Sequence, residues 1–151
     1  MRDGLQNEAV YFSVQKRASL AKKLCDAGLK RIELGAFVSP LWVPQMADTP
    51  VLFRRIHKAQ KEGKLPRGVQ FSALVPNLKG LENAKKSGVR EIAIFGSSSE
   101  TFSRKNINCS IKESLVKFKE VANSARSQKI KVRGYLSTAV SYTHLTLPTK
   151  A

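Results

Sequence analysis

The chain contains few cysteines and no long apolar segment. Its two cysteines, Cys25 and Cys109, lie far apart and match neither a zinc-ligand spacing nor a redox motif, which favours a reducing compartment. No apolar run approaches the ~20 residues of a membrane-spanning helix. No signal or transit segment precedes Arg2. The sequence therefore predicts a protein without a zinc site, a disulfide framework or a membrane partner.

Acidic residues and aromatic residues are also scarce. The 11 Asp and Glu residues face 27 Lys and Arg residues, a formal net charge of +16 that raises nucleic acid, anionic lipid or a phosphorylated small molecule as partners. The basic pairs are scattered on what read as outer helix faces: Lys16-Arg17, Lys22-Lys23, Arg54-Arg55, Lys85-Lys86 and Arg104-Lys105. Aromatic residues do not alternate with them, so nucleic-acid binding is disfavoured, and a basic RNA-binding module is kept only as an alternative.

Helix and strand patterns alternate along the chain. With 151 residues and 42% hydrophobic content, the chain is long enough for one domain with a buried core. Glycine ends a helix and precedes a strand twice, at 27–32 and again at 87–92, which indicates an internal repeat. The pattern predicts helices at 13–27, 48–62, 78–86 and from Ser110 with a Ser110/Glu113 capping box, strands at 29–34, 69–75, 91–95 and 130–136, and a polar loop at 96–109.

This alternation is typical of parallel βαβ units. It leaves two α/β architectures, a doubly wound sheet and a (β/α)8 TIM barrel. No glycine-rich phosphate-binding fingerprint follows any strand, which weakens the first. A complete barrel needs about 250 residues, so the sequence predicts a partial (β/α)8 barrel, roughly its first half.

The most polar stretch lies at the start of the chain. Residues 2–8 combine a guanidinium, two carboxylates and two amides around Gly4. Such a cluster is unlike a core segment, and we expect the backbone to leave regular structure here, with Gly4 available for a positive φ. In functional terms, Arg2 would be an electrophile beside Asp3, a carboxylate suited to a hard cation. The alternative is a solvated N-terminal turn.

Glu33 is a carboxylate inside an otherwise apolar strand. An acid near the C-terminal end of a strand either pairs with a cation or serves proton chemistry, and Arg2 is the candidate partner. A glutamate on a surface or an edge strand is the alternative interpretation.

Several motifs occur together in a recognisable order: Arg2-Asp3-Gly4-Leu5-Gln6-Asn7-Glu8, Glu33 with Phe37-Val38-Ser39-Pro40, Trp42-Val43-Pro44-Gln45-Met46, Pro76-Asn77-Leu78-Lys79-Gly80, Asn106-Ile107-Asn108-Cys109-Ser110 and Val132-Arg133-Gly134-Tyr135. From Arg2 to about Thr138 this combination resembles the 3-hydroxy-3-methylglutaryl-CoA lyases of the DRE-TIM metallolyase superfamily, which are (β/α)8 barrels. The Arg-Asp-Gly motif alone is shared with homocitrate and isopropylmalate synthases, so a related acyl-CoA enzyme of that type is the nearest alternative.

The resemblance implies a function and a site. The function is carbon–carbon cleavage of 3-hydroxy-3-methylglutaryl-CoA to acetyl-CoA and acetoacetate, a step of leucine degradation and ketone-body formation, with a divalent cation (Mg²⁺ or Mn²⁺). By this analogy Arg2 stabilises the enolate oxygen, Asp3 ligates the metal and Glu33 holds Arg2 in place. Substrate-binding positions would be Gln6, Asn106, Arg133 and Tyr135. The parent enzyme would be a homo-oligomer in the cytoplasm of a bacterium or, alternatively, in the mitochondrial matrix.

The other candidate residues have structural alternatives. Asn106 would be a turn residue, Tyr135 a core residue of its strand, and Arg133 the partner of an acid inside the barrel. Asn77 is expected as a helix N-cap, and Cys109 as a buried thiol because no histidine near it in sequence would activate it.

The chain also departs from the family pattern. The family takes further metal ligands from a His-x-His pair and an asparagine, and it uses a cysteine on a late loop, whereas His57 and His144 match none of these positions. We therefore expect residues 1–140 to be a partial, pyruvate carboxyltransferase-like TIM-barrel catalytic domain that is inactive and marginally stable alone. Residues 141–151 match nothing in the family and read as an artefact of a truncated frame.

Overall fold

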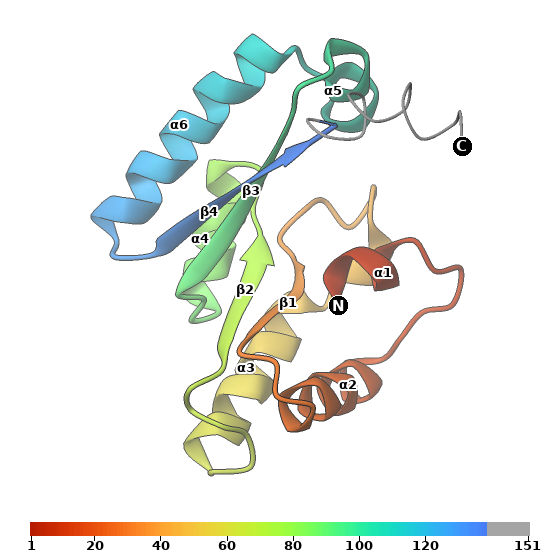
Figure 1. The fold of residues 1–151 in the computed structure, drawn as a ribbon, viewed down its shortest axis with the longest axis vertical. Coiled ribbons are helices and arrows are strands. Elements are labelled where there is room, and N and C mark those ends of the chain that lie inside the picture. The colour runs from red at the N-terminus through yellow and green to blue at the C-terminus, as the bar shows by residue number, and fades with distance from the viewer. Residues whose placement is uncertain (139–151) are drawn as a thin grey trace, which may run out of the picture.

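Four parallel strands form the centre of the computed structural model, which describes residues 1–138 (Figure 1). They are β1 (Arg31–Ala36), β2 (Gln70–Leu74), β3 (Glu91–Ser97) and β4 (Lys131–Ser137). Their order in the sheet is β1-β2-β3-β4, and each adjacent pair is parallel. Each new strand is thus added on the same side of its predecessor, as in a barrel wall, whereas a doubly wound sheet reverses direction.

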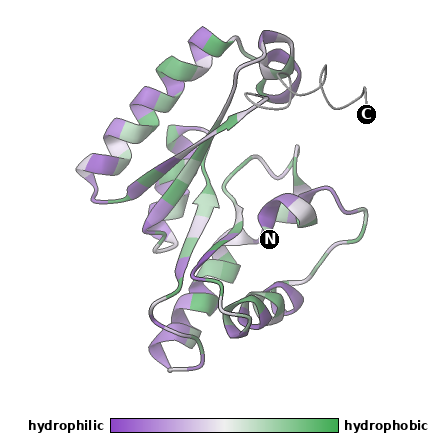
Figure 2. Ribbon diagram, in the orientation of Figure 1, coloured by the Kyte–Doolittle hydropathy of each residue, from purple (hydrophilic) through white to green (hydrophobic). Residues whose placement is uncertain are grey.

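Helices connect the strands, and several of them pack on one face of the sheet. They are α1 (Arg2–Gln6), α2 (Val14–Asp26), α3 (Thr49–Lys61), α4 (Leu78–Lys86), α5 (Glu100–Ile107) and α6 (Ile111–Ser127), with a 3-10 turn η1 (Pro44–Met46). Helices α2 and α3 pack against β1, and α6 packs against β3 and β4. Figure 2 shows α3 and α6 banded with hydrophobic and hydrophilic residues, as expected for helices with one buried side.

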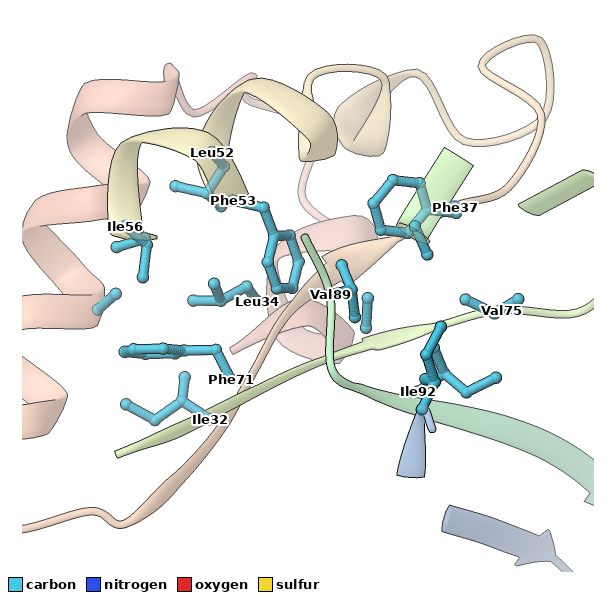
Figure 3. Close-up of a cluster of buried hydrophobic side chains, with 14 of the residues drawn as sticks. Ile32, Leu34, Phe37, Leu52, Phe53, Ile56, Phe71, Val75, Val89 and Ile92 are labelled. Atoms are coloured by element: carbon cyan, nitrogen blue, oxygen red, sulfur yellow. The ribbon is translucent and has the colours of Figure 1, made fainter. Parts of the chain in front are cut away.

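The core lies between the sheet and these helices. Ile32 and Leu34 of β1 alternate with Glu33 and point to the helix side, where Phe53 of α3 lies beside Leu34 (Figure 3). The Phe53 ring lies 6.0 Å from the ring of Phe37. Because the buried apolar side chains gather on the helix side, the opposite face of the sheet is left to residues such as Glu33.

The internal repeat predicted from the two glycines is confirmed in the backbone. Gly28 and Gly88 both adopt positive φ values, 89° and 77°. At each site the next residue donates its backbone N–H to the carbonyl five residues earlier, Leu29 to Leu24 and Val89 to Ala84. This is the Schellman pattern of helix termination, and it turns the chain from α2 into β1 and from α4 into β3.

Several predicted boundaries are confirmed, and one predicted loop is wrong. The Ser110/Glu113 capping box and the Asn77 N-cap are both present. The polar loop predicted at 96–109, however, contains α5, whose N-cap Ser99 accepts a hydrogen bond from the Phe102 N–H. Its polar composition gave little hydrophobic periodicity, so capping was the available signal.

The apolar spacing of the sequence predicts the buried sides of two helices, Val51, Leu52, Ile56 and Ala59 for α3 and Ile111, Leu115, Phe118, Val121, Ala122 and Ala125 for α6, and these predictions are partly wrong. Val51 is 46% exposed and Leu115 is 61% exposed, while the buried positions include Phe53 and Ser114. Each error displaces the apolar side of the helix by one or two residues, because the sequence alone does not fix how the helix is rotated on the sheet. The prediction for residues 141–151 lies outside the described residues.

None of the helices within residues 1–138 has the length and hydrophobicity needed to cross a membrane.

Gly80 offers a test of this packing. A Cβ at this position would lie 2.6 Å from the Phe37 carbonyl oxygen, where α4 approaches the loop after β1. We expect Gly80→Ala to lower the free energy of unfolding by about 1–3 kcal/mol in urea denaturation, because the backbone must shift. Gly68→Ala is the control, since a Cβ there has nothing within 4 Å. Equal stability of the two variants would contradict the close approach of α4.

Candidate active site

The N-terminal polar stretch forms a short helix, not the irregular turn that we predicted. Residues 2–6 make up α1, and Gly4 is not among the glycines with positive φ. The helical spacing brings Arg2 and Gln6, four residues apart, onto one side, where Arg2 Nη1 donates to Gln6 Oε1 at 3.1 Å. The prediction of a solvated turn is also wrong, because the Arg2 side chain is only 8% exposed.

Arg2 pairs with Glu33 across the interface between α1 and β1. Its Nε donates to Glu33 Oε1 at 2.7 Å, and the Glu33 side chain is 13% exposed. Arg2 Nη1 also donates to Asp3 Oδ1 at 3.1 Å. Acceptors on Glu33, Asp3 and Gln6 therefore orient a largely buried guanidinium, and within residues 1–138 no hydrogen bond uses its Nη2. The predicted Arg2–Glu33 partnership is confirmed as a contact.

Asp3 has a different environment. Its side chain is 81% exposed, and only its Oδ1 accepts hydrogen bonds from described residues, at 3.1 Å from Arg2 and 3.5 Å from Gln6. Glu33 Oε2, by contrast, is buried without a hydrogen-bond partner in the described part of the chain. One exposed carboxylate does not satisfy a divalent cation, which prefers about six oxygen ligands. No group of three or more His, Cys, Asp and Glu side chains within residues 1–138 is arranged to hold a metal, so the residues present supply at most part of such a site.

A second charged group lies on β3 and β4. Arg133 Nη2 is 4.0 Å from Glu91 Oε1, and the Glu91 side chain is buried. Interaction with the Tyr135 side chain, whose oxygen accepts from the guanidinium, followed by the negative charges of Glu91 and Glu33, raises the pKa of Arg133 above its usual value. The structure thus confirms the alternative in which Arg133 pairs with an acid, Glu91. The negative charge of Glu33 also contributes to the raised pKa of Arg133.

Asn106 is separate from both groups. It lies in the last turn of α5 and is exposed. Within the described residues, no hydrogen bond connects it to Arg2 or Arg133. The structure therefore brings Arg2, Asp3, Gln6 and Glu33 together, places Arg133 and Tyr135 on β4, three strands from β1, and leaves Asn106 apart. The turn alternative for Asn106 is wrong because the residue is helical, and Cys109 is buried as predicted.

Sequence reasoning missed one ion pair near this site. We predicted the Lys16-Arg17 pair to be solvated, yet Arg17 is 1% exposed and pairs with Asp48. Tyr11 also donates to Asp48, and this hydrogen bond raises the pKa of the Tyr11 phenol. A signal was available, because Arg17 precedes Ala21 and Cys25 by four and eight residues and so falls on the buried side of α2.

Known proteins resemble this chain in sequence. A family model described as HMGL-like matches residues 1–146. The 3-hydroxy-3-isohexenylglutaryl-CoA/hydroxy-methylglutaryl-CoA lyase of Pseudomonas aeruginosa is 49% identical over 136 residues, which are 90% of this chain and 43% of that protein. Similar proteins from rat and chicken are named as cytoplasmic and mitochondrial hydroxymethylglutaryl-CoA lyases. The chain therefore spans about two fifths of the length of the curated relatives it matches.

Solved structures show the same fold. The crystal structure of hydroxymethylglutaryl-CoA lyase from Pseudomonas aeruginosa superimposes with a TM-score of 0.81 at 49% identity, covering 89% of this chain and 43% of that one. An HMG-CoA lyase from Acinetobacter baumannii, in complex with coenzyme A and 3-methylmalate, gives a TM-score of 0.79 at 29% identity, covering 89% and 42%. The predicted fold, the first half of a parallel (β/α)8 barrel, is confirmed.

The Arg2–Glu33 pair makes a stability prediction. Glu33→Ala leaves the buried Arg2 charge without its main partner, so we expect the free energy of unfolding to fall by about 3 kcal/mol in urea denaturation. The control is Asp26→Ala, which removes an exposed partner of Lys22 and should change stability by less than about 0.5 kcal/mol. Similar losses from the two variants would show that Arg2 does not depend on Glu33.

Proposed function

We propose, since this chain belongs to the HMGL-like family, that it forms the first half of the active-site barrel of a hydroxymethylglutaryl-CoA lyase. The reaction would cleave 3-hydroxy-3-methylglutaryl-CoA into acetyl-CoA and acetoacetate. Because the chain spans 43% of its Pseudomonas relative, this activity is proposed for the whole protein. Residues 1–140 would be the part of the catalytic domain present here.

One observation supports this proposal above the others: the orientation of Arg2. The reaction begins when a base removes the proton of the tertiary hydroxyl. The carbonyl of acetoacetate then forms as the carbon–carbon bond breaks, and the bonding electrons move onto the thioester fragment as an enolate. A guanidinium already oriented by Glu33, Asp3 and Gln6 would meet that charge without reorganising, and Nη2 is the nitrogen left for the enolate oxygen. Protonation of the enolate carbon gives acetyl-CoA.

The remaining candidates would serve substrate binding. Arg133 and Tyr135 lie on the strand that pairs with β3, where Arg133 carries a positive charge close to Glu91. The thioester substrate carries a carboxylate and the phosphates of CoA, which suits a chain with a formal net charge of +16. Gln6 would orient Arg2, and Asn106 is retained as a predicted contact on the basis of its motif alone.

Asp3 would be one ligand of the divalent cation, Mg²⁺ or Mn²⁺, that the resemblance implies. Its exposed carboxylate has one oxygen without a hydrogen bond among residues 1–138. The other ligands would come from outside the described residues. When bound, the cation would polarise the substrate hydroxyl and lower its pKa.

The name of the Pseudomonas aeruginosa relative supports a second substrate. That protein is named for 3-hydroxy-3-isohexenylglutaryl-CoA as well as for the methyl compound. Assays should therefore compare both thioesters. A homo-oligomeric assembly and a cytoplasmic location are further parts of the proposal, with the mitochondrial matrix as the alternative.

Replacing Arg2 tests the proposed role directly. In the whole enzyme, we expect Arg2→Gln to lower kcat by about 100- to 1000-fold with little change in KM, because the interaction strengthens as the enolate forms. Arg54→Gln is the matched control, since Arg54 lies exposed on α3. Equal losses in kcat and substrate affinity would contradict the role.

Removing the metal tests Asp3. We expect a chelator to abolish thioester cleavage, and Mg²⁺ or Mn²⁺ to restore it. Asp3→Asn should raise the metal concentration needed for half-maximal activity at least tenfold, because a charged ligand is lost. Unchanged activity in the chelator would exclude the metal-dependent function, and an unchanged metal requirement in Asp3→Asn would exclude Asp3 as a ligand.

A further inference from the structure

The proposed function leaves one buried charge without a role, the Arg17 guanidinium of α2. Arg17 is the largest of the fully buried side chains in residues 1–138. Its Nη1 contacts Asp48 Oδ1 and donates to the Gln45 carbonyl oxygen at 3.2 Å, and its Nη2 donates to the Leu34 carbonyl oxygen at 3.2 Å. The guanidinium therefore joins α2 to the end of β1 and to the loop that follows β1.

Two residues that accept from Arg17, Asp48 and Gln45, also form hydrogen bonds with a third segment, the connection between α1 and α2. Tyr11 donates its hydroxyl to Asp48 Oδ2 at 2.6 Å. Gln45 donates its side-chain amide to the Glu8 carbonyl oxygen at 3.2 Å. Both Tyr11 and Glu8 lie between α1 and α2, so the chain that leaves α1 is held on the same loop that receives Arg17.

The backbone of β1 is adapted to this arrangement. Strand pairing with β2 shifts register between Glu33 and Gly35. A Cβ at Gly35 would lie 2.4 Å from Thr49 Oγ1 and 3.1 Å from Arg17 Nη2. Only glycine admits Thr49 and Arg17 so close to the strand, and it does so two residues from Glu33.

We propose that the buried Arg17–Asp48 ion pair is a positioning pair that places α1, and with it the Arg2 guanidinium, against Glu33 at the end of β1. Its catalytic consequence rests on the proposed function. Arg17 itself does not contact Arg2 or Glu33. It acts through Leu34, the residue after Glu33, and through the loop bonded to the α1–α2 connection.

The short length of α1 makes it dependent on such support. Five residues cannot form a stable helix alone. Helix α1 packs mainly on β1 and on η1, and η1 contains Gln45, which accepts a hydrogen bond from Arg17 through its carbonyl oxygen. A movement of η1 would therefore move Arg2, and a displacement of about 1 Å in a catalytic group can lower the rate about 100-fold.

The free energy needed to bury this ion pair also supports a role in positioning Arg2. Arg17 Nε is buried without a hydrogen-bond partner in the described part of the chain. Apolar residues of similar volume often stabilise a protein as well as a buried ion pair does. A directional guanidinium adds geometry that apolar packing does not, because its fork sets the distances between three segments.

The experiment compares single and double variants in the whole enzyme. We expect Arg17→Lys to lower kcat about 100-fold with KM within about twofold, since the lysine keeps the charge and loses the fork. Tyr11→Phe removes only the outer hydrogen bond, and we expect a kcat loss of about fivefold with an unchanged melting temperature. Lys16→Met, at the exposed neighbour of Arg17, is the control and should leave both quantities unchanged.

The double variant Arg17→Met/Asp48→Leu separates positioning from stability. We expect it to regain the melting temperature lost by Arg17→Met alone, and to keep the low kcat. Recovery of kcat together with the melting temperature would overturn the proposal, as would wild-type kcat in Arg17→Lys or in Tyr11→Phe.

A structural measurement keeps this test independent of the assay. In crystals of Arg17→Lys, we expect Arg2 Nε to have moved from its 2.7 Å contact with Glu33 Oε1. An unchanged contact would overturn the positioning role. If the wild-type enzyme cleaves neither thioester, the proposed function fails, whereas the Arg2–Glu33 distance in the variant still decides the role of Arg17.

Discussion

The pairing of Arg2 with Glu33 is the interaction on which the rest of the site depends. A guanidinium that is largely removed from water requires acceptors, and here Glu33, Asp3 and Gln6 supply them. Glu33 comes from β1 and the other two come from α1, so the pair also joins the first helix to the sheet. Because Arg2 is already oriented without substrate, its Nη2 would, in the proposed reaction, meet the enolate oxygen without the cost of reorganisation.

The two faces of the sheet differ in composition: one packs the apolar core, and the other carries charged side chains. Strand alternation sends Ile32 and Leu34 into the apolar core beneath α2 and α3, and it sends Glu33 to the opposite face. On that opposite face charged residues meet one another, with Arg133 close to Glu91 on the neighbouring strand. The same alternation therefore builds the core and leaves a polar surface, at which we propose that the charged thioester binds.

Much of the fold was predictable, because the signals are local. The glycines at 28 and 88 end helices in the way their backbone freedom dictates, and the Ser110/Glu113 capping box starts α6. The Arg2–Glu33 contact was also predicted, since an acid in an apolar strand needs a cation. The role of each site residue remains a prediction, because no contact in the structure reports on catalysis.

The errors share a physical cause, which is that tertiary packing overrides local composition. The polar composition of residues 2–6 does not indicate that they form a helix or that Arg2 is buried in it. Arg17 resembles a solvated residue beside Lys16 until Asp48 and the Leu34 carbonyl surround it. Helical periodicity could have placed Arg17 on the buried side of α2, but it could not name Asp48 and the Leu34 carbonyl as its partners, because these lie far from Arg17 in the sequence.

A crystal structure of the whole enzyme with an unreactive thioester analogue of the substrate would test the central claim most directly. The quantity to measure is the distance from Arg2 Nη2 to the thioester oxygen. The account predicts a hydrogen bond of about 2.7–3.2 Å with the Arg2–Glu33 contact intact. A thioester oxygen bound elsewhere, or an Arg2 side chain turned away from Glu33, would contradict it.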